Sequence, residues 1–173
     1  MLVKKLFPYL SAVLIFAAGY VLRISYTFSD RAAWSYIISG VNDSAWENYK
    51  PFGIAYIFFI IIELSSLRPR LMHFVCARLL GMYVLCSCTV ILNMIFSRFF
   101  PGITELSLVA AAIGIIFAQL VSYTLYKSSF YVEAFRIPLI LSLFAMVFML
   151  IVLSFYPPEW EIFYDFTAGK YGR

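Results

Sequence analysis

The residues best suited to chemistry stand together in one short polar segment between two apolar runs. Asn42 and Asp43 precede Ser44, and Glu47 and Lys50 follow within six positions. Ser44 and Glu47 have the spacing of a capping box, in which the hydroxyl accepts the N3 amide hydrogen and the carboxylate reaches back. Glu47 and Lys50, three positions apart, are neighbours on a helix surface. The segment predicts either a small polar binding site or a capped helix start with a solvated ion pair.

A second polar group occupies the carboxyl-terminal tail, residues 157–173, after a Pro-Pro pair. Asp165 followed by Thr167 and Gly169 predicts an Asx turn with the glycine at positive φ. Aromatic neighbours, among them Tyr171, are expected to press this turn onto the membrane interface. The tail is then either a lid over the 42–50 segment or a frayed end.

The elements that must position these groups are apolar helices. Of the 173 residues, 64% are hydrophobic and 13% are charged, whereas soluble domains are about half apolar and a quarter charged. The excess requires lipid as the solvent, and only helices or closed barrels satisfy the backbone there. Long unbroken apolar runs favour helices. The net charge of +4 is scattered, so no nucleic-acid partner is expected.

The apolar runs predict an all-α integral membrane protein, a single membrane domain built as a bundle of about five transmembrane helices. A capping signal at Ser44 starts the second helix, a Phe-Pro-Gly turn follows the third, and the Pro-Pro pair ends the last. The expected spans cover residues 6–28, 45–67, 72–97, 105–126 and 136–156, followed by the polar tail 157–173.

The loop before the second span has a weaker helical pattern. Ser29 or Asp30 could cap a short helix that Gly40 ends, lying as an amphipathic turn in the interface, and a plain loop is the alternative. Its apolar face would consist of Ala33, Trp34, Ile37 and Ile38.

Positive charges near the span ends indicate the orientation in the cell membrane. Lys4 and Lys5 precede the first span, and a compact loop from Arg68 to Arg78 lies on the same side. These charges favour a multi-pass protein with a cytoplasmic N-terminus and an external C-terminus. An odd number of spans also places the loop before residue 50 and the tail on the same side of the membrane.

A stripe of small residues runs along the fourth span at every fourth position. Small residues at this spacing let another helix approach closely, either within the bundle or in a dimer. The stripe consists of Ala110, Gly114, Ala118 and Ser122.

Three polar residues interrupt the long apolar spans. Glu63 is an intramembrane carboxylate, which marks a functional site or snorkels to the nearby Arg68 and Arg70. Asn93 and Gln119 are expected to form hydrogen bonds between helices.

Metal and cofactor motifs do not occur in this sequence. The lone His73 has no ligand partner in its neighbourhood, and Cys86 and Cys88 point to different faces of one helix. No catalytic residue, metal site or cofactor is assigned from the sequence.

The two polar segments resemble those of a small bacterial membrane-protein family of unknown function, about 170 residues long, with five predicted spans. Its signature V-N-E-S-x-W-E-H-x-K is similar to Val41-Asn42-Asp43-Ser44-Ala45-Trp46-Glu47-Asn48-Tyr49-Lys50, and its tail D-P-x-T-G-x-Y-G to residues 165–172. The family's histidine after Trp-Glu is Asn48 here, and a second one near the end of the first helix is Arg23. Histidine-based metal or proton chemistry is therefore not implied.

The leading hypothesis is a non-enzymatic binding or accessory subunit whose outer face, residues 42–50 with 162–172, binds a membrane-protein partner or a lipid headgroup. Glu47 and Asp165 would be acceptors, Lys50 a phosphate or carboxylate contact and Trp46 an interfacial anchor. The first alternative is an intramembrane lipid-modifying enzyme using Glu47 or Asp165 as general acid or base. The second is a small channel or transporter, which would need a homo-oligomer joined through the small-residue stripe.

Overall fold

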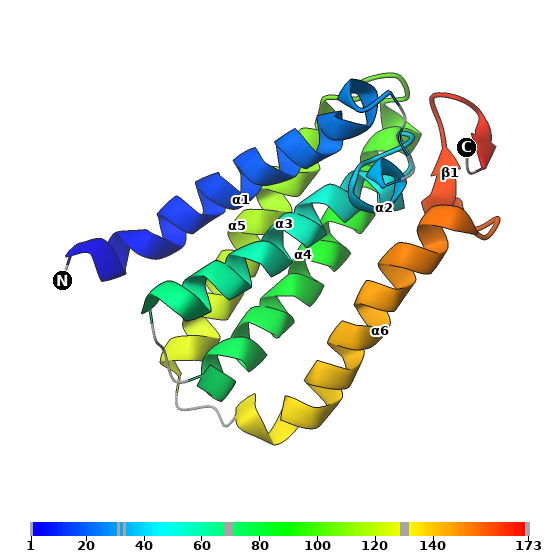
Figure 1. Ribbon diagram of the computed structural model, residues 1–173. Helices are drawn as coiled ribbons and strands as arrows, with labels where there is room; N and C mark the ends of the chain where they lie inside the picture. Colours follow the sequence, from blue (N-terminus) through cyan, green and yellow to red (C-terminus); the bar gives the residue numbers. More distant parts are fainter. Residues whose placement is uncertain (1, 31, 33, 68–70, 129–131, 172–173) are drawn as a thin grey trace.

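Long apolar segments, each free of internal glycine clusters, fold into five long helices in this computed structural model, which describes residues 2–30, 32, 34–67, 71–128 and 132–171. Four of them run side by side, and the fifth lies along the edge of the bundle (Figure 1). In chain order they are α1 (Leu2–Phe28), α3 (Ala45–Leu67), α4 (Leu71–Phe99), α5 (Leu106–Lys127) and, at the edge, α6 (Arg136–Phe155).

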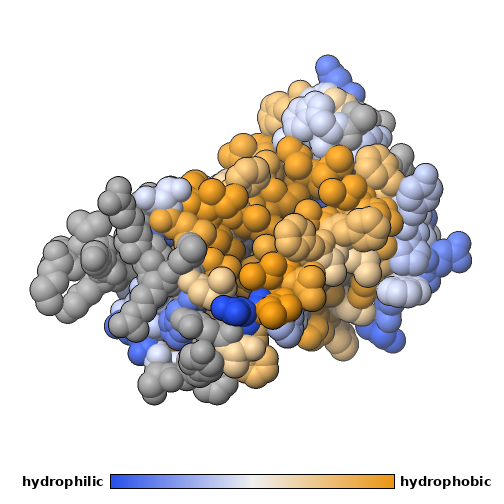
Figure 2. All heavy atoms as spheres, turned by 60° about the horizontal axis from the view of Figure 1, so that its bottom comes forward, coloured by the Kyte–Doolittle hydropathy of each residue, from blue (hydrophilic) through white to orange (hydrophobic). Residues whose placement is uncertain are grey.

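Four helices in the described part of the chain are long and apolar enough to cross a membrane: Tyr9–Phe28, Met72–Phe99, Leu106–Lys127 and Arg136–Phe155. Hydrophobic side chains accordingly cover much of the molecular surface in Figure 2, with hydrophilic ones at its edges. The predicted span 45–67 is the helix α3, which is not among the four. It carries three charged residues, Glu47, Lys50 and Glu63.

Short elements join and close the bundle. The 3-10 turns η1 (Val132–Phe135) and η2 (Glu161–Phe163) precede and follow α6, and α2 (Ser35–Ile38) lies between α1 and α3. In the tail, β1 (Tyr164–Asp165) pairs antiparallel with β2 (Lys170–Tyr171).

The short helix before α3 differs from the prediction. It begins at Ser35, and Trp34 at its N-cap makes no side-chain capping bond. Asp30 instead adopts a positive φ of 49°, so neither Ser29 nor Asp30 caps the helix. The helix ends at Ile38, with Ser39 rather than Gly40 as its C-cap, and Ala33 of the expected face lies outside the described residues.

The closest helix contact joins α4 to α5 through small residues. The stripe Ala110, Gly114, Ala118 and Ser122 is buried within this chain. A Cβ on Gly114 would lie 2.4 Å from Thr89 Oγ1 of α4. A Cβ on Gly81 of α4 would lie 1.9 Å from Ser122 Oγ. Close approach of the two backbones therefore requires glycine on both helices.

A buried polar cluster joins α3, α4 and α5. Arg78 forms an ion pair with Glu63 and donates a hydrogen bond to Gln119 Oε1. Tyr56 and Ser122 form a hydrogen bond beside it, 2.9 Å long. The sequence placed Arg78 with the loop charges and Glu63 with Arg68 and Arg70, which lie outside the described residues. The structure corrects this, because Arg78 lies inside α4 and compensates the carboxylate.

Gln119 forms the predicted hydrogen bond between helices, whereas Asn93 does not. Gln119 accepts from Arg78 across the α4–α5 contact, as predicted. Asn93 donates to Thr89 O of its own helix, at 2.8 Å.

Replacement of Gly81 by alanine is expected to destabilise the protein by about 1–3 kcal/mol, because the added methyl group has no space. Thermal unfolding in detergent would measure this loss. Phe117→Ala on the exposed face of α5 is the control and should change the midpoint little. An unchanged midpoint for Gly81→Ala would contradict the close α4–α5 contact.

Breaking the Glu63–Arg78 pair is expected to cost about 3–5 kcal/mol, because one charge remains buried without its partner. Arg78→Met and Glu63→Leu should each lower the unfolding midpoint strongly. The double variant should recover a large part of the loss, since both charges are then removed. Additive losses in this double-mutant cycle would argue against a direct pair.

Candidate functional site

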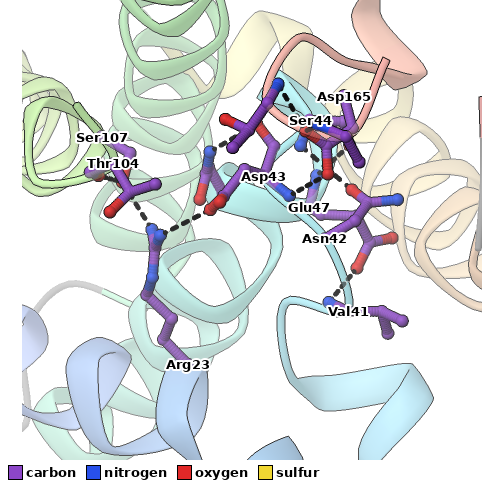
Figure 3. Close-up of polar contacts among 12 residues, drawn as sticks. Arg23, Val41, Asn42, Asp43, Ser44, Glu47, Thr104, Ser107 and Asp165 are labelled. Carbon is purple, nitrogen blue, oxygen red and sulfur yellow. Dashed lines mark hydrogen bonds and ion pairs between the residues drawn. The ribbon is translucent and has the colours of Figure 1, made fainter. Parts of the chain in front are cut away.

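The 42–50 segment folds into a compact polar loop at the start of α3. Ser44 Oγ accepts the amide hydrogen of Glu47 at 3.4 Å, which is one half of the predicted capping box. Glu47 does not complete the other half in the expected way, because its Oε2 accepts the amide hydrogen of Val41 at 2.9 Å. Asn42 Oδ1 accepts the amide hydrogen of Ser44 at 3.0 Å (Figure 3).

Lys50 is fully buried, with a relative exposure of 0%. Its Nζ lies 2.7 Å from Glu47 Oε2 and 2.7 Å from the carbonyl oxygen of Tyr36, and it donates to Ser154 Oγ at 3.1 Å. The ammonium therefore ties α3 to α2 and α6. Of its two predicted roles, contact with a carboxylate is met inside the chain by Glu47, whereas Lys50 is too deeply buried in this structure to be a phosphate contact on the outer face.

Trp46 also points inward, so the prediction of an interfacial anchor is wrong. Its ring lies 5.8 Å from that of Tyr49 and 5.7 Å from that of Phe163, measured between centroids. The indole therefore packs η2 of the tail against the start of α3.

Asp165 holds the tail turn and attaches it to the 42–50 segment. Its Oδ1 accepts the amide hydrogens of Thr167 and Ala168 at 2.8 and 2.9 Å. Gly169 has a φ of 66°, so the predicted Asx turn with a left-handed glycine is confirmed. Asp165 Oδ2 accepts the amide hydrogen of Asp43 at 3.1 Å, a contact between residues 122 positions apart (Figure 3).

Arg23 closes the other side of the same loop. Its guanidinium donates to Asp43 Oδ1 at 3.2 Å and to Ser107 Oγ at 2.7 Å. It therefore links α1, the loop before α3 and the start of α5 (Figure 3). Only two of its five N–H groups are needed for these contacts, so the guanidinium keeps further donors.

Burial raises the pKa of Asp43 above its ordinary value of 3.8. The Arg23 guanidinium acts in the opposite direction, and the nearby carboxylates of Asp165 and Glu105 raise the pKa further. Since the folded state binds this proton more tightly, ionised Asp43 opposes folding. That cost is absent below pH 3.8 and develops as the pH rises through the raised pKa.

A cleft of about 780 Å³ opens between the end of α1, the α2 region and the tail. Both predicted polar segments contribute to it, so the structure brings them together. Hydroxyl groups, one ion pair and one exposed ammonium line its walls. The lining residues used below are Arg23, Tyr26, Tyr36, Asp43, Thr167 and Lys170, and together they define the polar-end cleft.

The predicted site residues divide into three groups. Asn42, Asp43, Asp165 and Thr167 line the cleft. Gly169 and Tyr171 shape the tail hairpin, in which Tyr171 packs on Tyr164 with ring centroids 4.9 Å apart. The interior positions are Ser44, Trp46, Glu47 and Lys50.

Sequence reasoning did not assign Arg23 to the site and did not single out Lys170 within the 162–172 tail, although both line the cleft. Arg23 stands where the first apolar run ends, and a charge at that point was the available signal. Ser154 accepts a hydrogen bond from the Lys50 ammonium. In the sequence it is one of two serines in an apolar run, and nothing there indicated this role.

The long apolar helices and the polar end of the bundle define a polytopic membrane protein. The chain belongs to the family of unknown function DUF6512, whose sequence profile matches residues 2–173. No curated protein and no solved structure matches this chain.

Replacement of Asp165 by alanine is expected to release the tail from the bundle. Hydrogen bonds to a charged acceptor contribute about 1.5–3 kcal/mol each, so the amides of Asp43, Thr167 and Ala168 should exchange with deuterium at least roughly tenfold faster. Mass spectrometry of exchanged peptides would measure the change. Glu161→Ala, which removes only an exposed pair with Arg98, should leave the exchange unchanged, and equal exchange in both variants would contradict the attachment.

Proposed function

We propose that the protein is a five-span membrane protein that binds a phosphate-bearing lipid headgroup in the polar-end cleft. The observation that carries the proposal is the cleft of about 780 Å³, to which two distant polar segments, Arg23 and Lys170 all contribute. Its volume falls within the range typical of small-ligand pockets. A concave site of this size suits a headgroup better than the flat surface of a protein partner.

The fifth span in this proposal is α3. Its 23 residues would extend about 34 Å at 1.5 Å per residue, enough to cross the hydrocarbon core. Its charges do not oppose this, because Glu63 is paired with Arg78 and Lys50 with Glu47. The exposed side of α3 carries Phe58, Ile61 and Ile62, which suit contact with acyl chains.

The cationic groups of the cleft would hold the phosphate. Lys170 is exposed on β2 and presents an ammonium at the cleft wall. Arg23 supplies its remaining N–H donors from the opposite wall, while Asp43 fixes the orientation of the guanidinium. Tyr26 and Tyr36, whose hydroxyls lie 3.2 Å apart, would add hydrogen bonds to the headgroup.

The position of the cleft supports a lipid as the source of the phosphate. Its α1 wall borders exposed apolar residues, with Val21 60% and Phe28 80% exposed. Acyl chains could lie along this helix while the headgroup enters the cleft. With an external C-terminus, as we propose from the charge pattern, the cleft faces the outer leaflet.

Lys170→Ala is expected to weaken headgroup binding about threefold to tenfold, because it removes one exposed charge contact of roughly 1 kcal/mol. Native mass spectrometry of the protein with added anionic phospholipid would measure the bound fraction. Lys127→Ala is the matched control, since it removes an exposed lysine at the opposite end of the bundle. Equal retention by both variants would contradict the proposed site, and chemical conversion of the lipid would favour the enzyme alternative.

A further inference from the structure

A narrow groove lies between α1 and α5, and it shares no lining residue with the polar-end cleft. Its volume is about 80 Å³, and its walls are apolar or aromatic. Tyr9 and Ala12 of α1 face Ile116, Leu120 and Tyr123 of α5 across it, with Gln119 completing the lining. Ile116 and Leu120 are 55% and 52% exposed, so the groove opens to the side of the bundle that meets lipid.

Gln119 gives this groove an unsatisfied polar group. Its side chain is 5% exposed, and its Nε2 has no hydrogen-bond partner among the described residues. A buried N–H group without an acceptor costs several kcal/mol in a hydrocarbon environment. An acceptor from outside the chain would remove that cost.

The orientation of the carboxamide is held from the other side. Gln119 Oε1 accepts a hydrogen bond from Arg78, and only the oxygen of a carboxamide can accept from a guanidinium. Since Arg78 is also paired with Glu63, the amide cannot rotate to exchange its oxygen and nitrogen without losing a charge-assisted bond. The N–H donors are therefore preorganised.

The depth of the groove limits the ligand. Gln119 lies eight residues before Lys127 at the end of α5, which corresponds to about 12 Å along the helix. The ester carbonyls of phospholipids lie at the edge of the hydrocarbon core, above this level. The acceptor must therefore belong to an apolar molecule that enters the core itself.

We infer that the α1–α5 groove binds a lipid-soluble carbonyl compound of the quinone class, whose carbonyl oxygen accepts a hydrogen bond from Gln119 Nε2. The aromatic rings of Tyr9 and Tyr123 flank a flat ring, and the aliphatic side chains contact its tail. This site is independent of the proposed headgroup cleft, because it uses different residues and a ligand without phosphate.

The test uses the full chain in lipid nanodiscs and two photoreactive probes with the same diazirine-bearing alkyl tail. One probe carries a benzoquinone ring and the other a benzene ring without carbonyl groups. Crosslinked peptides are quantified by mass spectrometry. A hydrogen bond in a membrane protein contributes about 0.6–2 kcal/mol, so the quinone should label residues 9–12 and 116–123 about threefold to thirtyfold more than the benzene probe.

Three variants separate binding from folding. Gln119→Met should reduce quinone labelling to the level of the benzene probe, and Ile116→Trp should fill the groove and abolish both signals. Ser122→Ala removes another buried hydrogen bond of α5, that with Tyr56, and should leave the quinone preference intact.

Equal labelling of the wild-type protein by the two probes would overturn the inference, and this comparison does not require any variant to fold. A quinone preference that persists in Gln119→Met would overturn it as well. Neither result bears on the headgroup cleft, which is tested with Lys170→Ala.

Discussion

Charged groups among apolar helices must find partners inside the protein, and the arrangement of this molecule around α3 follows from that constraint. Lys50 and Glu63 are both buried on α3, thirteen positions apart. The partners of Lys50 come from its own helix, from α2 and from α6. The partner of Glu63 comes from α4, and α5 joins that cluster through Gln119. Four other helices are thereby tied to α3 by groups that could not be left unpaired.

The polar end of the bundle shows how the same requirement shapes a site. Most side chains of the 42–50 segment form hydrogen bonds with one another or with the backbone, so few of them are left to contact a ligand. Asp165 behaves alike, since its two oxygens accept three backbone hydrogens. The groups that remain for a ligand are at the edges, on the end of α1 and on β2, where Arg23 and Lys170 lie.

Close packing has a related consequence on the opposite side of the cluster. The α4–α5 contact requires glycine at Gly81 and Gly114, which draws the two backbones together. This contact places Arg78 against Gln119 and fixes one side of the carboxamide. The other side is left facing the α1–α5 groove without an acceptor. A polar contact that stabilises the interior thus also leaves a buried donor unsatisfied at the side of that groove.

Hydropathy and short residue patterns act locally. Hydropathy with capping and turn residues was sufficient to predict the helical class and the ends of the long helices within a few residues, and the Asx pattern predicted the tail turn at Asp165. The length of an apolar run and the reach of a short side chain to its own backbone depend on near neighbours in the chain. Which buried charge pairs with which depends on contacts between distant segments. Sequence spacing therefore assigned Glu63 to Arg68 and Arg70, and left Lys50 and Trp46 at the surface. Only the tertiary packing brought Arg78 to Glu63, Ser154 to Lys50 and Phe163 to Trp46. A group removed from water is stabilised by the partners that lie next to it in space, whatever their distance along the chain.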